Sequence, residues 1–96
     1  MKLDDLLKES RTIWGDRRMT LPEIVTAMGV NYGDICRYAR DKSEGKKVDE
    51  TELKKELGNT VFSLIRWMDD LGYSAEDCIA LARQAQTRYQ KVNKRT

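Results

Sequence analysis

The chain has 96 residues and a mass of 11.1 kDa, which predicts a single domain over residues 1–96. A hydrophobic fraction of 40% excludes a disordered tail, and no apolar run approaches the roughly 20 residues that a membrane span needs. Eighteen basic and sixteen acidic side chains give a net charge of +2. Acidic residues at the N-terminus do not fit a secretory signal, so we expect a cytoplasmic protein.

The residues that are missing exclude several kinds of catalysis. The chain has no histidine, which rules out serine–histidine triads, histidine-bound zinc and imidazole acid–base chemistry. Cys36 and Cys78 are far apart and lack the C-x-x-C spacing of a metal or redox motif, so buried thiols are expected. Any catalysis would therefore depend on carboxylates, amides, hydroxyls or a bound cation.

The first half of the chain predicts two helices. Apolar residues at three-to-four spacing indicate the first helix over about residues 3–14. Thr20 and Glu23 predict a capping box at the start of a second helix, which we expect to run over about residues 21–41. The segment 42–47 has no apolar residue and contains a glycine, which is typical of a loop.

Two further helices are predicted in the second half. A third helix is expected to begin at Asp49 and to end at Gly72, and Ser74 is expected to cap a fourth. The third helix has an apolar stripe at Leu53, Leu57, Val61, Leu64, Met68 and Leu71. The fourth has a stripe of mostly small residues, which predicts close helix packing, at Ala75, Cys78, Ala82, Ala85, Tyr89 and Val92. The expected fold is an all-α antiparallel bundle of about four helices, completed by dimerisation because a 96-residue core is thin.

The third helix also has a polar stripe, formed by Glu56, Asn59, Ser63, Arg66 and Asp70. At 100° per residue these side chains share one face, roughly opposite the apolar stripe. Glu56 and Asn59 are three residues apart, so both can reach one cation, and Mg²⁺ prefers oxygen ligands of this kind. The alternative interpretation is that this face is only the solvated side of an amphipathic helix.

Four segments together resemble one enzyme family. They are Lys55–Phe62, the Trp67–Ile79 segment with its Leu-Gly turn and acidic helix start, the closing Lys91–Arg95 segment, and Asn31–Ile35. This pattern resembles the MazG-like nucleotide pyrophosphohydrolases over about residues 13–95. The resemblance implies an all-α hydrolase that uses Mg²⁺, or Mn²⁺, to cleave a nucleoside triphosphate into the monophosphate and pyrophosphate.

The resemblance also implies roles for individual residues. Glu56 and Asp34 occupy positions of metal-binding, catalytic carboxylates, whereas Asn59 and Asn31 stand where the family has two more acids. Amide oxygens still coordinate a hard cation but bring no charge, so weaker metal binding and weakened or altered activity are expected.

The remaining implications concern the phosphates and the assembly. Arg66, Lys91 and Arg95 are expected to bind the phosphates, and a water molecule is expected to be the nucleophile. Members of the family are dimers or larger, which implies a homodimer or a homotetramer.

Two other functions remain open from the sequence. Residues 21–40 fit a helix-turn-helix DNA-binding unit if the chain breaks at Gly29, with Asn31 among the base-reading side chains. The third possibility is a helical interaction protein without chemistry, in which Trp14, Trp67 and Phe62 would be interface aromatics.

Overall fold

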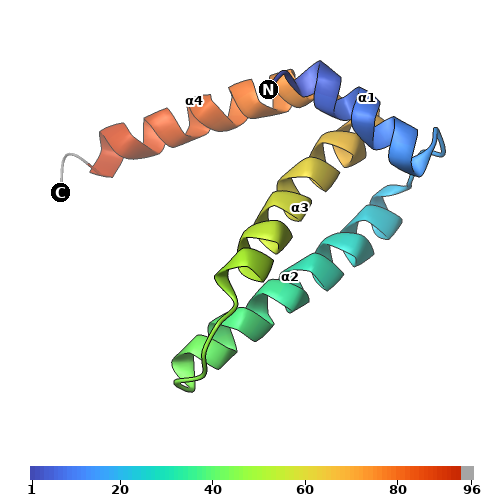
Figure 1. Cartoon of the computed structure of the whole chain (residues 1–96). Helices are drawn as coiled ribbons and strands as arrows, with labels where there is room; N and C mark the ends of the chain where they lie inside the picture. Colours follow the sequence, from blue (N-terminus) through green and yellow to red (C-terminus); the bar gives the residue numbers. More distant parts are fainter. Residues whose placement is uncertain (94–96) are drawn as a thin grey trace.

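The computed structural model describes residues 1–93 of the chain, and these residues contain four helices. They are α1 (Leu3–Trp14), α2 (Leu21–Ser43), α3 (Glu50–Asp70) and α4 (Ala75–Asn93). α2 and α3 form an antiparallel hairpin, α1 packs at the end of α3 remote from the hairpin loop, and α4 leaves from that same end (Figure 1). No strand occurs within the described residues, so the predicted all-α helical fold is confirmed.

Side-chain caps fix the starts of the two hairpin helices. Thr20 Oγ1 accepts a hydrogen bond from the backbone N–H of Glu23, and Glu23 Oε1 accepts one from the backbone N–H of Thr20 at 3.1 Å. Asp49 Oδ1 accepts from the backbone N–H of Glu52 at 3.2 Å. These bonds satisfy N–H groups that have no partner within the helix, so both helices begin where the sequence predicts.

The turn between α3 and α4 determines the direction in which α4 leaves. Gly72 has a φ of +82°, a conformation that strains any residue with a Cβ atom. The backbone N–H of Tyr73 donates to the carbonyl of Met68 at 2.9 Å, and Ser74 Oγ accepts from the backbone N–H of Asp77 at 3.4 Å. The predicted glycine stop and serine cap are both confirmed.

α2 runs through Gly29 and Gly33 without a break. The helix-turn-helix unit hypothesised for residues 21–40 is therefore not formed, because such a unit needs a turn before its recognition helix. Neither glycine serves close helix packing within the single chain, since a Cβ at either position would meet no atom within 4 Å. Each glycine thus weakens α2 without a compensating contact inside the described chain.

The core lies where α1 and the start of α2 meet the C-terminal half of α3. Its buried hydrophobic side chains are Ile24, Ile65 and Trp67. Three polar side chains are buried with them, namely Ser10, Arg66 and Asp70. Trp67 is therefore a core residue rather than an interface aromatic, whereas Phe62 is half-buried and Trp14 is exposed.

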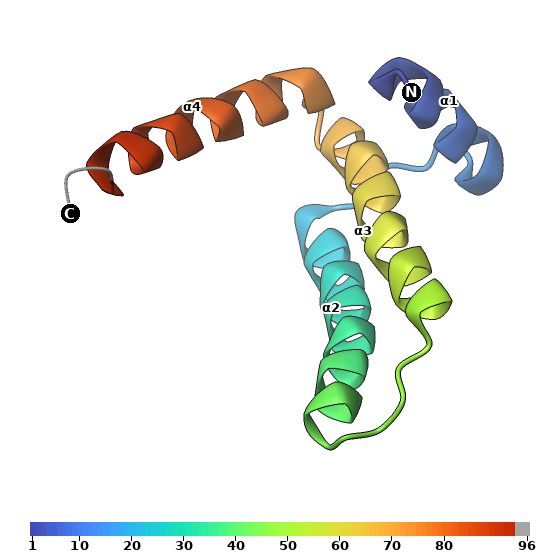
Figure 2. The same ribbon diagram turned by 60° about the vertical axis from the view of Figure 1, so that its left-hand side comes forward.

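The folded chain leaves much of its surface uncovered. Its accessible surface is 7821 Å², whereas a monomeric protein of 11.1 kDa is expected to have about 5,700 Å². The radius of gyration is 16.3 Å, compared with about 12.5 Å for a compact domain of this length. Figure 2 shows the cause, which is that α4 extends away from the other three helices.

Two stripes that the sequence predicts to be packed are partly open. Leu57 and Val61, in the first half of α3, are 49% and 63% exposed, so the predicted apolar stripe is not buried there. The small-residue stripe of α4 has no helix packed along it within residues 1–93, because the turn at Gly72 directs α4 away from the hairpin. The predicted close helix packing is therefore wrong for the single chain.

Candidate functional site

The polar residues predicted to bind a metal lie mostly along the contact between α2 and α3. On α2, every third or fourth side chain is at least partly buried, so these side chains form one stripe along the helix. The stripe faces α3, which is the helix packed against α2. The stripe consists of Ile24, Ala27, Met28, Asn31, Asp34, Ile35, Tyr38 and Asp41. An amide and two carboxylates are thus set among apolar side chains at this contact.

The facing stripe of α3 is also largely polar. Its partly buried members are Glu52, Leu53, Glu56, Thr60, Ser63 and Leu64. Glu56 and Ser63, which belong to the polar face of α3, are therefore turned toward α2 rather than toward solvent as expected for an ordinary amphipathic helix. We call the two facing stripes, Ile24–Asp41 on α2 and Glu52–Leu64 on α3, the α2–α3 seam.

The hairpin register places Asp34 and Glu56 on neighbouring turns. α2 ends at Ser43 and α3 begins at Glu50, so Tyr38 and Lys55, each five residues from the loop, lie at a similar level in the antiparallel pair. Asp34 lies four residues before Tyr38 on α2, and Glu56 lies one residue after Lys55 on α3. Both displacements point away from the hairpin loop. In antiparallel helices the difference of three residues is an offset of about 4.5 Å along the axis. Neighbouring axes are about 8–10 Å apart, so a side chain of the length of Glu56 can reach across the seam toward the level of Asp34.

Ion pairs balance some of the seam carboxylates but not Glu56. Asp34 Oδ1 lies 3.6 Å from Arg37 Nη2, one turn along α2. Glu52 Oε2 accepts a hydrogen bond from Lys55 Nζ at 2.5 Å, and this bond raises the pKa of Lys55. Glu56 forms no ion pair with any residue in 1–93, which leaves a half-buried carboxylate free to accept a ligand.

The donors along the seam fit a hard cation in type. Carboxylate oxygens of Asp34 and Glu56 and the amide oxygen of Asn31 are ligands that Mg²⁺ and Mn²⁺ prefer. Asn59 is exposed and lies outside the seam. Within the described chain no three acidic or thiol side chains converge on one point, so the protein would leave several coordination positions to water and phosphate.

Two acidic seam residues were not singled out from the sequence. Glu52 lies one turn before Glu56 on the same side of α3, and Asp41 lies two turns beyond Asp34 on α2. The spacing of four and of seven residues was the available signal, because it keeps side chains on one helix face. The two extend the line of carboxylates toward the closed end of the hairpin.

A hollow of about 870 Å³ at that closed end is lined by three lysines and by the acidic residues Asp49 and Glu50. The lysines are Lys42, Lys46 and Lys47, and Leu53 borders the hollow one turn from Glu56. Lys46 Nζ lies 2.9 Å from Glu44 Oε2, so part of this positive charge is already balanced. The sequence analysis treated this segment only as a loop, because a short run of lysines between helices is also typical of a solvated turn.

The predicted phosphate-binding residues lie elsewhere. Arg66 is buried, donates to Ser10 Oγ at 3.1 Å and has its guanidinium 5.0 Å from the centre of the Trp14 ring. Burial lowers the pKa of Arg66, and its contacts fasten α1 to α3 rather than leave it open to a ligand. Lys91 is exposed near the far end of α4, and Arg95 lies outside the described residues. Neither Arg66 nor Lys91 is brought to the seam by the described chain.

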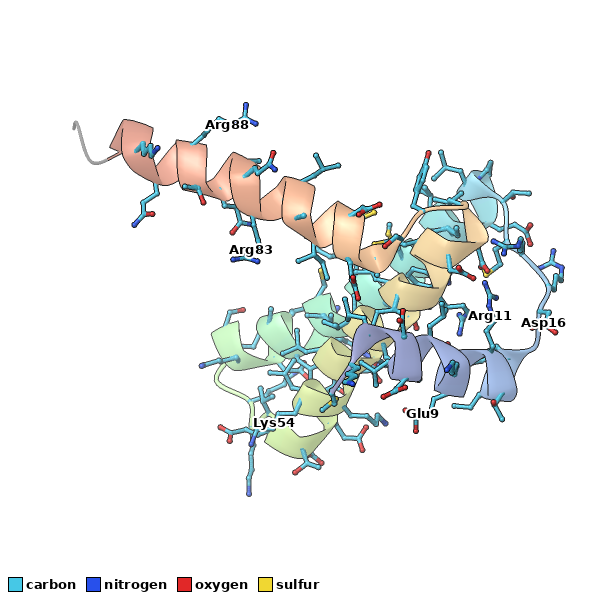
Figure 3. All side chains as sticks on the ribbon, turned by 90° about the horizontal axis from the view of Figure 1, so that it is seen from above. Glu9, Arg11, Asp16, Lys54, Arg83 and Arg88 are labelled. Carbon is cyan, nitrogen blue, oxygen red and sulfur yellow. The ribbon has the colours of Figure 1, made fainter. Side chains whose placement is uncertain are left out.

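A second charged cluster joins α1 to the last turn of α3. Arg11 Nη2 lies 2.6 Å from both Asp69 Oδ2 and Asp70 Oδ1, and Figure 3 shows Arg11 reaching from α1 toward α3. Arg18 donates to the backbone carbonyl of Asp69. The hydrogen bond with Asp69 raises the pKa of Arg11, so its charge is permanent and its role is to hold the two helices together.

Comparisons of the chain with protein-family models, with curated proteins and with solved structures give no match. Within residues 1–93, no helix combines the length and the apolar content that a membrane crossing requires. A functional assignment therefore depends on the side chains of the α2–α3 seam and on the sequence pattern around them.

Proposed function

We propose that the chain is a Mg²⁺-dependent nucleoside triphosphate pyrophosphohydrolase of the MazG-like type, with weakened or altered activity. The observation that supports this most directly is the placement of Asp34 and Glu56 on facing, half-buried stripes of two adjacent helices. The unbroken α2 and the α3–α4 turn also agree with the arrangement that the sequence resemblance implies.

In this proposal the seam binds the cation and the hollow binds the far phosphates. Asp34 and Glu56 supply two charged oxygens, and Asn31 supplies a neutral one or a hydrogen bond to phosphate. The lysines that line the hollow, Lys42 and Lys47 in particular, face the negative charge of the departing pyrophosphate. A bound Mg²⁺ would neutralise phosphate charge and make the α-phosphorus more electrophilic.

The chemistry needs only water as a co-reactant. Water adds to the α-phosphorus and gives up a proton to solvent, the bond from that phosphorus to the bridging oxygen breaks, and pyrophosphate leaves with that oxygen. The electron-rich seam carboxylates orient the water, while the half-buried setting strengthens their electrostatic effect. With two amides in place of two acids, the cation is expected to bind less tightly than in a four-carboxylate site.

We also propose that the protein acts as a homodimer, with a homotetramer as the alternative. The uncovered surface exceeds the expectation for a monomer by about 2,100 Å², whereas a standard interface covers about 800 Å² on each partner. A symmetric partner would cover apolar side chains that the single chain leaves open.

A second candidate function is a helical interaction protein without catalysis. The observation in its favour is the number of large apolar side chains that remain exposed on the four helices, which include Trp14, Tyr32, Val61 and Leu81. This function would use the same fold but would not require Glu56 or Asp34.

Pyrophosphate release from a panel of nucleoside triphosphates, with Mg²⁺, separates the two functions. Glu56→Gln and Asp34→Asn should each lower release by about a hundredfold, because each removes a charged oxygen at the proposed site. Glu9→Gln is the matched control, since Glu9 is an exposed carboxylate on α1 and should retain full release. If the unaltered protein releases no pyrophosphate, or if Glu56→Gln releases as much as the unaltered protein, the catalytic proposal is wrong and the interaction function is favoured.

A further inference from the structure

α4 projects from the rest of the molecule as an arm. It meets α3 only near the turn that joins them, and every residue from Ile79 to Lys91 is exposed. Figures 1 and 2 both show α4 diverging from the α2–α3 hairpin. Because the turn at Gly72 is held by backbone hydrogen bonds, α4 cannot fold back onto its own hairpin without breaking them.

The arm is amphipathic, although nothing in the described chain covers it. Cys78, Leu81, Ala85 and Tyr89 lie within about a quarter of a turn of one another, and Leu81 and Tyr89 are 66% and 70% exposed. In proteins most helical stability comes from the packing of an apolar face, and the described chain supplies no such packing along the 19 residues of α4. A surface outside this chain is therefore needed to cover the stripe.

The hairpin has an uncovered apolar surface that matches the arm. Leu21, Val25 and Tyr32 form an exposed stripe on α2, and Leu57 and Val61 form one on α3. On each helix the exposed stripe lies about a third of a turn around the helix axis from the seam. The sense of this rotation is the same for both helices when each is viewed from its N-terminus. In antiparallel helices such rotations point to the same side, so the five residues share one surface. We call it the outer apolar face.

Length and charge both favour the arm as the occupant of this face. At 1.5 Å per residue, the 19 residues of α4 span about 28 Å, and the 23 residues of α2 span about 34 Å. From Cys78 to Lys91 the arm has no acidic residue and three basic ones, Arg83, Arg88 and Lys91. Figure 3 shows Arg83 and Arg88 projecting on opposite sides of α4. The neighbouring seam has four carboxylates, of which Asp34 and Glu52 already pair with cations on their own helices, whereas Asp41 and Glu56 do not within residues 1–93.

We propose that α4 is a dimerisation arm that packs on the outer apolar face of a second copy of this chain. Each chain has both the arm and its complementary face, so two copies can exchange arms around a two-fold axis and close without free ends. The excess surface of about 2,100 Å² per chain is enough for such an exchange, which buries more than a standard interface. This assembly does not depend on the proposed catalysis.

Cross-linking from the arm to α2 tests the exchange directly. Cys36 is exposed on α2, about 40° of rotation from Tyr32 and thus beside the outer apolar face. In a Cys78→Ser background, Ala85→Cys should give a bismaleimide link between position 85 of one chain and Cys36 of another. Thr87→Cys in the same background is the control, because position 87 lies on the opposite side of α4. Links between two Cys36 residues alone, or equal yields in the control, would overturn the proposal.

The oligomeric state of two aspartate variants provides an independent test. Light scattering at micromolar concentration should show a dimer for the unaltered protein and for Ala80→Asp, and a monomer for Leu81→Asp. Ala80 and Leu81 are adjacent and both exposed, but only Leu81 lies on the apolar stripe. Circular dichroism should show that the first three helices persist in both variants. A monomeric unaltered protein, or a dimeric Leu81→Asp variant, would refute the exchange of arms.

Discussion

Replacement of Arg11 by leucine is expected to destabilise the entire fold. Arg11 Nη2 lies 2.6 Å from a carboxylate oxygen of both Asp69 and Asp70. The Asp70 side chain is 0% exposed, and its Oδ2 has no hydrogen-bond partner. Without Arg11, Asp70 would be a buried carboxylate that is near the charges of Arg66 and Arg17 but hydrogen-bonded to neither. The loss of a partner from a buried pair is costly because the remaining charge is neither solvated nor neutralised.

The expected loss is about 3 kcal/mol, near the lower end of the range for a broken buried pair. The lower end applies because Asp69 is 32% exposed and can be solvated when Arg11 is absent. A chain of 96 residues has a total stability of roughly 5–14 kcal/mol, so this loss is a large share of it. The melting temperature should fall by about 12–24 °C.

Urea unfolding followed by the fluorescence of Trp67, which is buried beside this cluster, measures the change. The double variant Arg11→Leu/Asp70→Leu should recover most of the lost stability, since it removes the stranded charge together with its partner. Arg40→Leu, at an exposed position on α2, serves as the control. If Arg11→Leu unfolds at the same urea concentration as the unaltered protein, the junction between α1 and α3 is not what we describe.

Two further predictions concern α2. Hydrogen bonds from Arg17 and then from Thr20 lower the pKa of Glu23, so its stabilising effect is present at neutral pH and is lost as the pH falls through that lowered pKa. Glu23→Gln should therefore unfold more easily than the unaltered protein at neutral pH and equally easily in acid, because glutamine can keep the capping box but not the charge that pairs with Arg17; a difference that persists in acid would contradict a contribution from that charge. Gly33→Ala should raise the free energy of unfolding by about 0.5–1 kcal/mol, because alanine favours the helix and its Cβ meets no atom within 4 Å. A destabilised Gly33→Ala variant would instead indicate close packing at this position in an assembly.

The helix boundaries could be predicted because their signals are local. Thr20 and Glu23 are three residues apart, and Gly72 and Ser74 lie within one turn of the helix ends that they define. Such hydrogen bonds form regardless of what packs around them. The sequence alone allowed a break in α2, because its interior glycines also fit a turn. The unbroken helical hydrogen bonding shows that α2 is continuous.

The packing could not be predicted in the same way. The apolar stripe of α3 was expected to face the core, but Leu57 and Val61 are exposed while Glu56 is half-buried. Periodicity identifies a stripe and not its partner, and here the single chain does not contain a partner for the first half of that stripe. The link between Arg11 and Asp69 spans 58 residues, and the sequence pattern gave no sign of this pairing.

The candidate site was predicted in part. Asp34, Asn31 and Glu56 were selected from the sequence and lie along one helix contact, whereas Asn59 lies outside it. Helix geometry alone placed Arg66 on the polar face beside Glu56, but α1 covers that part of α3 and Ser10 accepts its hydrogen bond. A helical-wheel projection of one helix does not show which part of each face another helix will cover.

Binding of Mn²⁺ tests most directly whether Asp34 and Glu56 hold a divalent ion together. Titration of the full chain with Mn²⁺, with free Mn²⁺ followed by electron paramagnetic resonance, should show one bound ion per chain. Asp34→Asn and Glu56→Gln should each release that ion, and Glu9→Gln should retain it. If the unaltered protein leaves all Mn²⁺ free, or if both seam variants bind it as tightly as the unaltered protein does, the seam is not a metal site.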